Sequence, residues 1–120
     1  MLNDLTISDI LAMQKALHDY HDPEGTKWTP LKPSGAHNYL LYMIEEVGEA
    51  IAIMKKKGDS SIMEDTAVRA HFVEELGDVL MYYSAVLLSY GITPEEFSTI
   101  FYEKHQRNIG RDFHREYEEK

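Results

Sequence analysis

The stretch Leu40–Met54, LLYMIEEVGEAIAIM, decides the fold of this chain. Its apolar residues recur at intervals of three and four, which is the period of an α-helix and not that of a strand. A second stretch of the same kind, Phe72–Leu87, FVEELGDVLMYYSAVL, follows after a polar segment. No segment of the sequence alternates with a period of two, so we expect an all-α protein built around these two helices.

Each of the two helical stretches carries an acidic doublet, Glu46-x-x-Glu49 and Glu75-x-x-Asp78. Residues at i and i+3 share one helix face, and two antiparallel helices would bring the two acidic rows together. A single doublet is usually just a solvated helix edge, but two on consecutive apolar helices favour a metal site. The all-oxygen ligand set suits Mg²⁺ or Mn²⁺, whereas a di-iron bundle would need Glu-x-x-His.

Capping signals and helix breakers define the remaining elements. Thr6 and Asp9 form a capping-box pair, and Gly58 follows a lysine run as a left-handed cap. Thr93 precedes a proline and two glutamates, which is a strong helix start. We therefore expect helices over residues 6–20, 34–57, 66–90 and 93–108, with loops over 21–33 and 59–65. The expected architecture is a single all-α domain over residues 1–120 with a four-helix bundle-like fold.

The composition limits the classes of function. With 120 residues and 43% hydrophobic content, the chain can bury one core. Its formal charge of −9 argues against nucleic-acid binding, which requires a cationic surface. The absence of cysteine and the lack of a signal-peptide pattern at residues 1–4 are typical of a cytoplasmic protein. The longest apolar run, Val79–Leu88, is shorter than the about 20 residues of a membrane helix, so we expect no membrane partner.

Three motifs carry a resemblance to a known family. They are Glu45-Glu-Val-Gly-Glu49, Glu74-Glu-Leu-Gly-Asp78 and Lys104-x-x-x-Asn108-x-x-Arg111. Together they resemble the MazG-like all-α nucleoside triphosphate pyrophosphohydrolases, which include dimeric dUTPases, dCTP pyrophosphatases and phosphoribosyl-ATP pyrophosphohydrolase. The resemblance implies Mg²⁺-dependent cleavage of a (d)NTP to a (d)NMP and pyrophosphate, with Mn²⁺ as a substitute, in nucleotide-pool housekeeping.

The resemblance also implies roles for individual residues. Both doublets would bind metal, and Glu45 and Glu46 would be the catalytic carboxylates, with Glu45 orienting the water or standing in the outer shell. The segment Tyr20-His21-Asp22-Pro23 is similar to a stretch that lines the base pocket of the dCTP pyrophosphatases. The expected metal ligands are Glu46, Glu49, Glu75 and Asp78. The expected substrate-binding residues are His21, Trp28, Tyr82, Lys104, Asn108 and Arg111.

Several alternatives stay open at the level of sequence. Ordinary packing would also explain Trp28 and Tyr82, and a solvated helix end would explain the motif from Lys104 to Arg111. The cytosine preference of the dCTP branch is not transferred, because Lys55-Lys56-Lys57 stands where that branch carries an aromatic residue. Other functions compatible with the pattern are phosphoribosyl-ATP pyrophosphohydrolysis and a non-catalytic helical dimerisation or interaction module.

The width of the apolar face on the 34–57 helix predicts a homo-oligomer. A stripe of five apolar residues is widened by four more, beyond what one neighbouring helix can cover. We expect a homodimer or homotetramer formed through the 34–57 and 66–90 helices. The resemblance implies that residues of a neighbouring chain help to close the nucleotide pocket. The stripe comprises Leu40, Ile44, Val47, Ile51 and Met54, and it is widened by Leu41, Met43, Ala50 and Ile53.

Overall fold

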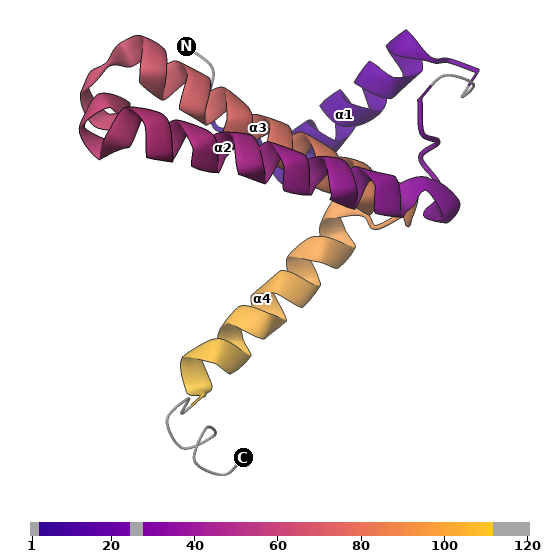
Figure 1. Cartoon of the computed structure of the whole chain (residues 1–120). Coiled ribbons are helices and arrows are strands. Elements are labelled where there is room, and N and C mark those ends of the chain that lie inside the picture. The colour runs from indigo at the N-terminus through magenta and orange to yellow at the C-terminus, as the bar shows by residue number, and fades with distance from the viewer. Residues whose placement is uncertain (1–2, 25–27, 112–120) are drawn as a thin grey trace.

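The computed structural model describes residues 3–24 and 28–111, so part of the 21–33 loop lies outside the described residues. Within these ranges the chain is helical and contains no strand, which confirms the all-α prediction (Figure 1). No helix among the described residues combines the length and apolarity needed to cross a membrane. The elements are α1 (Ile7–His21), the 3-10 helix η1 (Pro33–Gly35), α2 (Ala36–Glu64), α3 (Thr66–Ser89) and α4 (Pro94–Gly110).

Side-chain caps begin the first and last helices at the predicted residues. The Thr6 hydroxyl accepts a hydrogen bond from the Asp9 backbone N–H at 3.1 Å, and the Asp9 carboxylate accepts one from the Thr6 N–H at 2.9 Å. The Thr93 hydroxyl likewise accepts from the Glu96 N–H at 3.1 Å. These bonds satisfy backbone donors that the first turn of a helix leaves unpaired.

The predicted loop over residues 59–65 is wrong for most of its length. Gly58 has a positive φ of 80° with ψ 165°, which is not the left-handed helical conformation of the expected cap, and α2 resumes after it and continues to Glu64. Ile62 anchors this extra piece of helix because its side chain is only 8% exposed. Asp65 then caps α3 by accepting hydrogen bonds from two backbone N–H groups, so a single residue joins the two helices.

The helices form an open arrangement around one antiparallel pair. α2 and α3 lie side by side, α1 packs against α3, and α4 projects away from the pair (Figure 1). Near its start α4 touches α3 through Tyr83 and Phe97, whose ring centroids are 6.2 Å apart. The radius of gyration is 17.8 Å, whereas a compact chain of this length would have about 14 Å. A single chain therefore does not close into a compact bundle.

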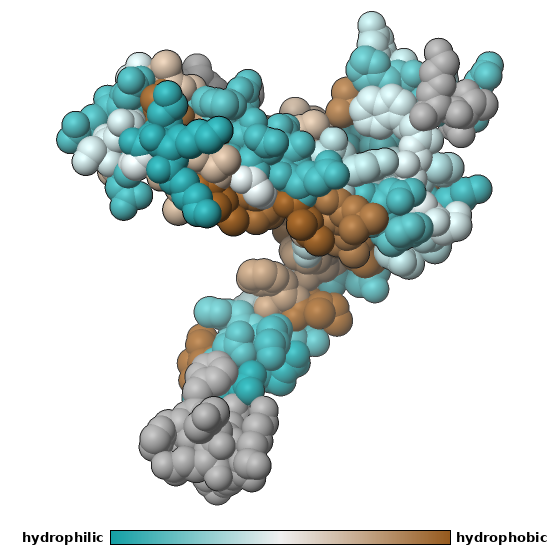
Figure 2. Space-filling model, viewed as in Figure 1, coloured by the Kyte–Doolittle hydropathy of each residue, from teal (hydrophilic) through white to brown (hydrophobic). Residues whose placement is uncertain are grey.

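The core is small and leaves a wide apolar face in solvent. Tyr39, Ala50 and Ile53 of α2 are buried, together with Ala85 and Leu87 of α3. The predicted stripe of α2 is instead 38% to 62% exposed in the single chain. Figure 2 shows the corresponding hydrophobic band along the helix pair and onto the start of α4. The exposed members on α2 and α3 include Leu40, Ile44, Val47, Ile51, Met54, Val73, Leu76, Leu80 and Met81.

Candidate functional site

Three carboxylates from two helices converge in the groove between α2 and α3. Glu46 comes from α2, and Glu75 and Asp78 come from α3; each offers an oxygen within 4.8 Å of the others. All three side chains are half-buried. The i, i+3 spacing puts Glu75 and Asp78 on the face of α3 that packs against α2. The predicted approach of the two acidic rows is thus present for three of the four expected ligands.

The three carboxylates repel one another in the absence of a cation. A hydrogen-bonding contact with the Glu75 carboxyl, followed by burial and the charges of Asp78, Glu75 and Glu49, raises the pKa of Glu46 to about 7. Burial, followed by the charges of Glu75 and Glu74, raises the pKa of Asp78. Oxygen Oε2 of Glu75 is buried and has no hydrogen-bond partner among the described residues. An orphaned acceptor beside two further carboxylates fits a hard divalent cation.

His71 holds one member of this group in place. Its Nε2 lies 3.3 Å from Oε1 of Glu75, one helical turn along α3. The other oxygen of this carboxylate, Oε2, is the one that is buried without a hydrogen-bond partner among the described residues. The arrangement resembles the way an outer partner orients a ligating side chain.

The other acidic residues of the first motif lie outside this group. Glu49 and Glu45 are both exposed, and neither belongs to the set of converging oxygens. Glu49 instead lines a neighbouring cavity in the same groove, together with His71 and two lysines. Within one chain, Glu49 therefore lies next to the three-carboxylate group and outside it, although it shares a helix face with Glu46.

An aromatic cavity lies one helical turn from the carboxylates. Trp28, Thr29, Tyr39, Tyr42 and Tyr82 line this space of about 260 Å³. The rings of Tyr42 and Tyr82 are 5.6 Å apart, across the α2–α3 groove. Burial, followed by the charges of Glu46 and Asp78, raises the pKa of Tyr82, as expected for a phenol near the carboxylates. Trp28 and Tyr82, which the sequence analysis selected separately, thus share one cavity.

Sequence reasoning missed Tyr39 and Tyr42. A signal was present, because Tyr42 precedes Glu46 by four residues just as Tyr82 follows Asp78 by four. In antiparallel helices these two offsets point to the same end of the groove. The Tyr39 hydroxyl donates to the backbone carbonyl of Thr29 and so ties the loop to α2.

His21 contacts Trp28 and does not line the aromatic cavity. The two rings stack at 5.5 Å with an interplanar angle of 8°. Trp28 is also fixed through its backbone N–H, which donates to the Asp22 carboxylate at 2.7 Å. His21 therefore packs against the indole ring of Trp28 without lining the aromatic cavity itself.

The structure does not bring the α4 motif to the carboxylates of the same chain. Lys104, Asn108 and Arg111 are exposed on the distal part of α4, which points away from the α2–α3 pair (Figure 1). Within one chain, these three residues therefore lie apart from the carboxylate group.

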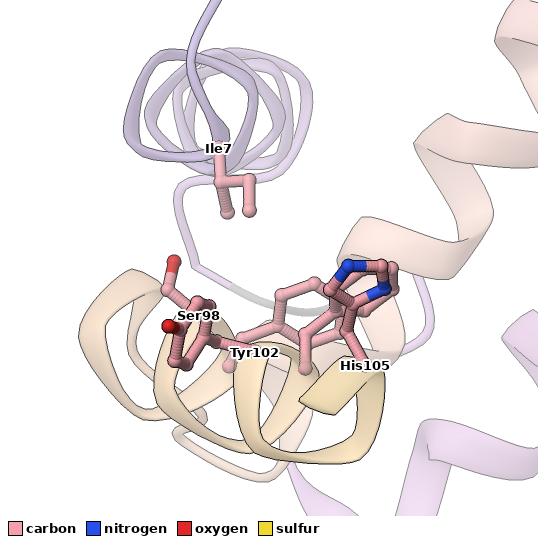
Figure 3. Close-up of a pocket in the computed structure, with 6 residues that line it drawn as sticks. Ile7, Ser98, Tyr102 and His105 are labelled. Atoms are coloured by element: carbon pink, nitrogen blue, oxygen red, sulfur yellow. The ribbon is translucent and has the colours of Figure 1, made fainter. Parts of the chain in front are cut away.

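A further cavity of about 450 Å³ lies between the start of α1 and α4. In Figure 3, Ile7 of α1 faces the side chains of Ser98, Tyr102 and His105 on α4. Its lining contains no carboxylate and none of the expected site residues. The cavity is mainly a gap between two loosely packed helices.

Comparison of the chain with models of known protein families identifies the class of protein to which it belongs. The chain belongs to the MazG nucleotide pyrophosphohydrolase domain family, whose model matches residues 34–112. The matched region contains all four predicted ligands and the α4 motif, whereas His21 and Trp28 precede it. Comparison with curated proteins and with solved structures gave no match.

Proposed function

We propose that this protein is a Mg²⁺-dependent nucleoside triphosphate pyrophosphohydrolase, which converts a (d)NTP and water to a (d)NMP and pyrophosphate. The observation that carries the proposal is the group of Glu46, Glu75 and Asp78 beside an aromatic cavity, in a chain of the MazG family. A metal-binding group and a place for a planar base are the two parts that such a reaction requires.

The metal ligands would be Glu46, Glu75 and Asp78, with Glu49 as the fourth carboxylate. A bound Mg²⁺ or Mn²⁺ supplies positive charge to the phosphate oxygens and to the developing negative charge of the leaving group. The orphaned Oε2 of Glu75 and the raised pKa of Glu46 support this assignment, because both reflect unbalanced negative charge.

The reaction joins the water oxygen to the α-phosphorus and breaks the bond from the α-phosphorus to the bridging oxygen. Pyrophosphate leaves, and the proton of the attacking water passes to a carboxylate. We assign this proton to Glu46, which belongs to the carboxylate group, or to Glu45, which precedes it in the sequence and is exposed. The protein otherwise contributes position and electrostatics, as is usual in phosphoryl chemistry.

Trp28, Tyr42 and Tyr82 would hold the base and sugar of the substrate. Aromatic side chains bind every nucleobase by stacking, and each stacked base contributes about 1–3 kcal/mol. The cavity volume of about 260 Å³ is suited to a planar group of that kind. His21 supports this site through its stack on the indole ring.

We further propose that the working form is a homodimer or homotetramer. The exposed apolar band on α2 and α3 and the projecting α4 both support association of chains. A neighbouring chain would then present Lys104, Asn108 and Arg111 to the triphosphate. These residues can supply charged and polar donors for phosphate oxygens.

The decisive experiment is a panel of canonical and modified dNTPs and NTPs, with phosphoribosyl-ATP included, in the presence of Mg²⁺. The expected products are a nucleoside monophosphate and pyrophosphate, resolved by chromatography. Asp78→Asn serves as the inactive control. Release of a diphosphate and orthophosphate contradicts the proposal, and no turnover of any substrate supports the non-catalytic interaction module.

A further inference from the structure

The groove between α2 and α3 continues past the carboxylates into a cavity of about 360 Å³. Its floor includes Ile53 and Val68, and Glu49, Lys56 and Lys57 of α2 lie on its α2 side. His71 stands on the opposite side, where it also contacts Glu75. His71 therefore connects the cavity to the carboxylate group, because it lines the cavity and contacts Glu75.

The two lysines are directed toward this groove by helix geometry. At 100° per residue, Lys57 lies about 20° and Lys56 about 80° from Glu46 around α2. Long helical side chains lean toward the N-terminus of their own helix. Because the lysines follow Glu49 by seven and eight residues, their stems lean back toward the carboxylates. The axial separation of Glu49 and Lys56 is about 10 Å.

Neither lysine forms an ion pair with another described residue. The ion pairs among the described residues are Lys15–Asp19 and His71–Glu75, and neither involves Lys56 or Lys57. Two unpaired ammonium groups thus border a cavity next to a cluster of carboxylates. The cavity lining itself carries these two lysines against a single carboxylate, Glu49, and in a protein of formal charge −9 such a pair of lysines points to an anionic ligand.

We propose that Lys56 and Lys57 bind the β- and γ-phosphates of the substrate and the pyrophosphate product. This inference rests on the proposed function and extends it to the leaving group. Along α2 the order becomes aromatic cavity, carboxylates and lysines, which matches the order of base, α-phosphate and pyrophosphate in a nucleoside triphosphate. Lysine is suited to this task because its compact charge binds phosphate oxygens without a fixed geometry.

The first test measures binding without turnover. Inorganic pyrophosphate is titrated into the protein with Mg²⁺ and followed by calorimetry, for the wild type, Lys56→Gln/Lys57→Gln and Lys55→Gln. Lys55 is the matched control, because it lies about 180° from Glu46 around the helix and does not line the cavity. We expect the double variant to bind pyrophosphate at least about tenfold more weakly, since two charge-assisted contacts are lost. Lys55→Gln should bind as the wild type does.

A kinetic measurement completes the test. The double variant should lose inhibition by pyrophosphate and much of its preference for a triphosphate over the corresponding diphosphate. Equal losses in Lys55→Gln, or unchanged pyrophosphate affinity in the double variant, would overturn the inference. If the wild type binds pyrophosphate through these lysines but hydrolyses no nucleotide, the proposed reaction fails while the anion site stands. Circular dichroism of all three proteins verifies that the helices are intact.

Discussion

Glu46 of α2 and Glu75 of α3 face each other with carboxyl oxygens within 4.8 Å, although 28 residues separate them along the chain. The adjacent Glu75 carboxyl raises the pKa of Glu46 to about 7. Oε2 of Glu75 is buried and has no hydrogen-bond partner among the described residues. The pair stores unfavourable interactions that a cation would relieve.

Removing one carboxylate of the group should abolish turnover without destabilising the protein. Glu46→Gln and Asp78→Asn each remove a ligand charge at nearly constant shape, so activity should fall by orders of magnitude. Stability without metal should stay level or rise, because mutual repulsion decreases. Glu64→Gln, at the exposed end of α2, is the control. Wild-type rates in both site variants would show that these carboxylates have no role in catalysis and form only a solvated helix edge.

Divalent cations should stabilise the wild type. A ligand that binds only the folded state at 100 times its Kd adds about 2.7 kcal/mol to the free energy of unfolding. We expect the Tm to rise when Mg²⁺ or Mn²⁺ replaces EDTA, and EDTA to abolish activity reversibly. Asp78→Asn should show a much smaller rise. An equal rise in both proteins would mean that the cation acts elsewhere.

The pH dependence of stability without metal should carry the signature of Glu46. Its pKa is raised from the ordinary 4.5 to about 7, so between these values the folded state holds a proton that the unfolded chain has released. The free energy of unfolding then falls as pH rises through this window. Glu46→Gln should lack this component, as measured by denaturant titrations from pH 4.5 to 8 in EDTA. Parallel profiles for the two proteins would contradict the assignment.

Tyr42 should contribute to nucleotide affinity. Tyr42→Ala removes one wall of the aromatic cavity, and a lost stacking contact of about 1–3 kcal/mol corresponds to a KM raised about fivefold or more. Tyr42→Phe keeps the ring and should retain most of the affinity. An unchanged KM in Tyr42→Ala would show that the ring serves only to pack α2 against α3.

The protein should associate through the apolar band on α2 and α3. Light scattering at micromolar concentration should give at least twice the 13.9 kDa of one chain. Gly48 and Gly77 point to the same association. Nothing in the single chain requires glycine at either position, because an added Cβ would meet no atom within 4 Å. Glycine is unfavourable inside a helix by about 1 kcal/mol, so a close approach by another chain would explain both.

Charge introduced into the band tests the surface directly. Leu80→Arg should shift the protein toward monomer and lower its activity, since Leu80 is 45% exposed on α3. Met63→Arg is the control, because Met63 is 69% exposed at the far end of α2. A fully active, monodisperse monomer of the wild type would refute the association.

The sequence by itself determined the local elements and the kinds of chemistry they carry. Helical periodicity, the Thr6 and Thr93 caps and the glycine at 58 act within one or two turns, so neighbouring residues are enough to specify them. The same locality placed the acidic doublets on helix faces. Local signals failed to predict residues 59–64, which are helical and bury the Ile62 side chain by packing within the tertiary structure.

Only the tertiary structure decided which side chains meet. The register between α2 and α3 brings Glu46 to Glu75 and Asp78 while Glu49 faces the lysine-lined cavity. The same register places Tyr42 opposite Tyr82. The direction of α4, which separates its cationic motif from the carboxylates, depends on contacts at its first turns. These outcomes follow from packing between segments far apart in the chain, which no local pattern encodes.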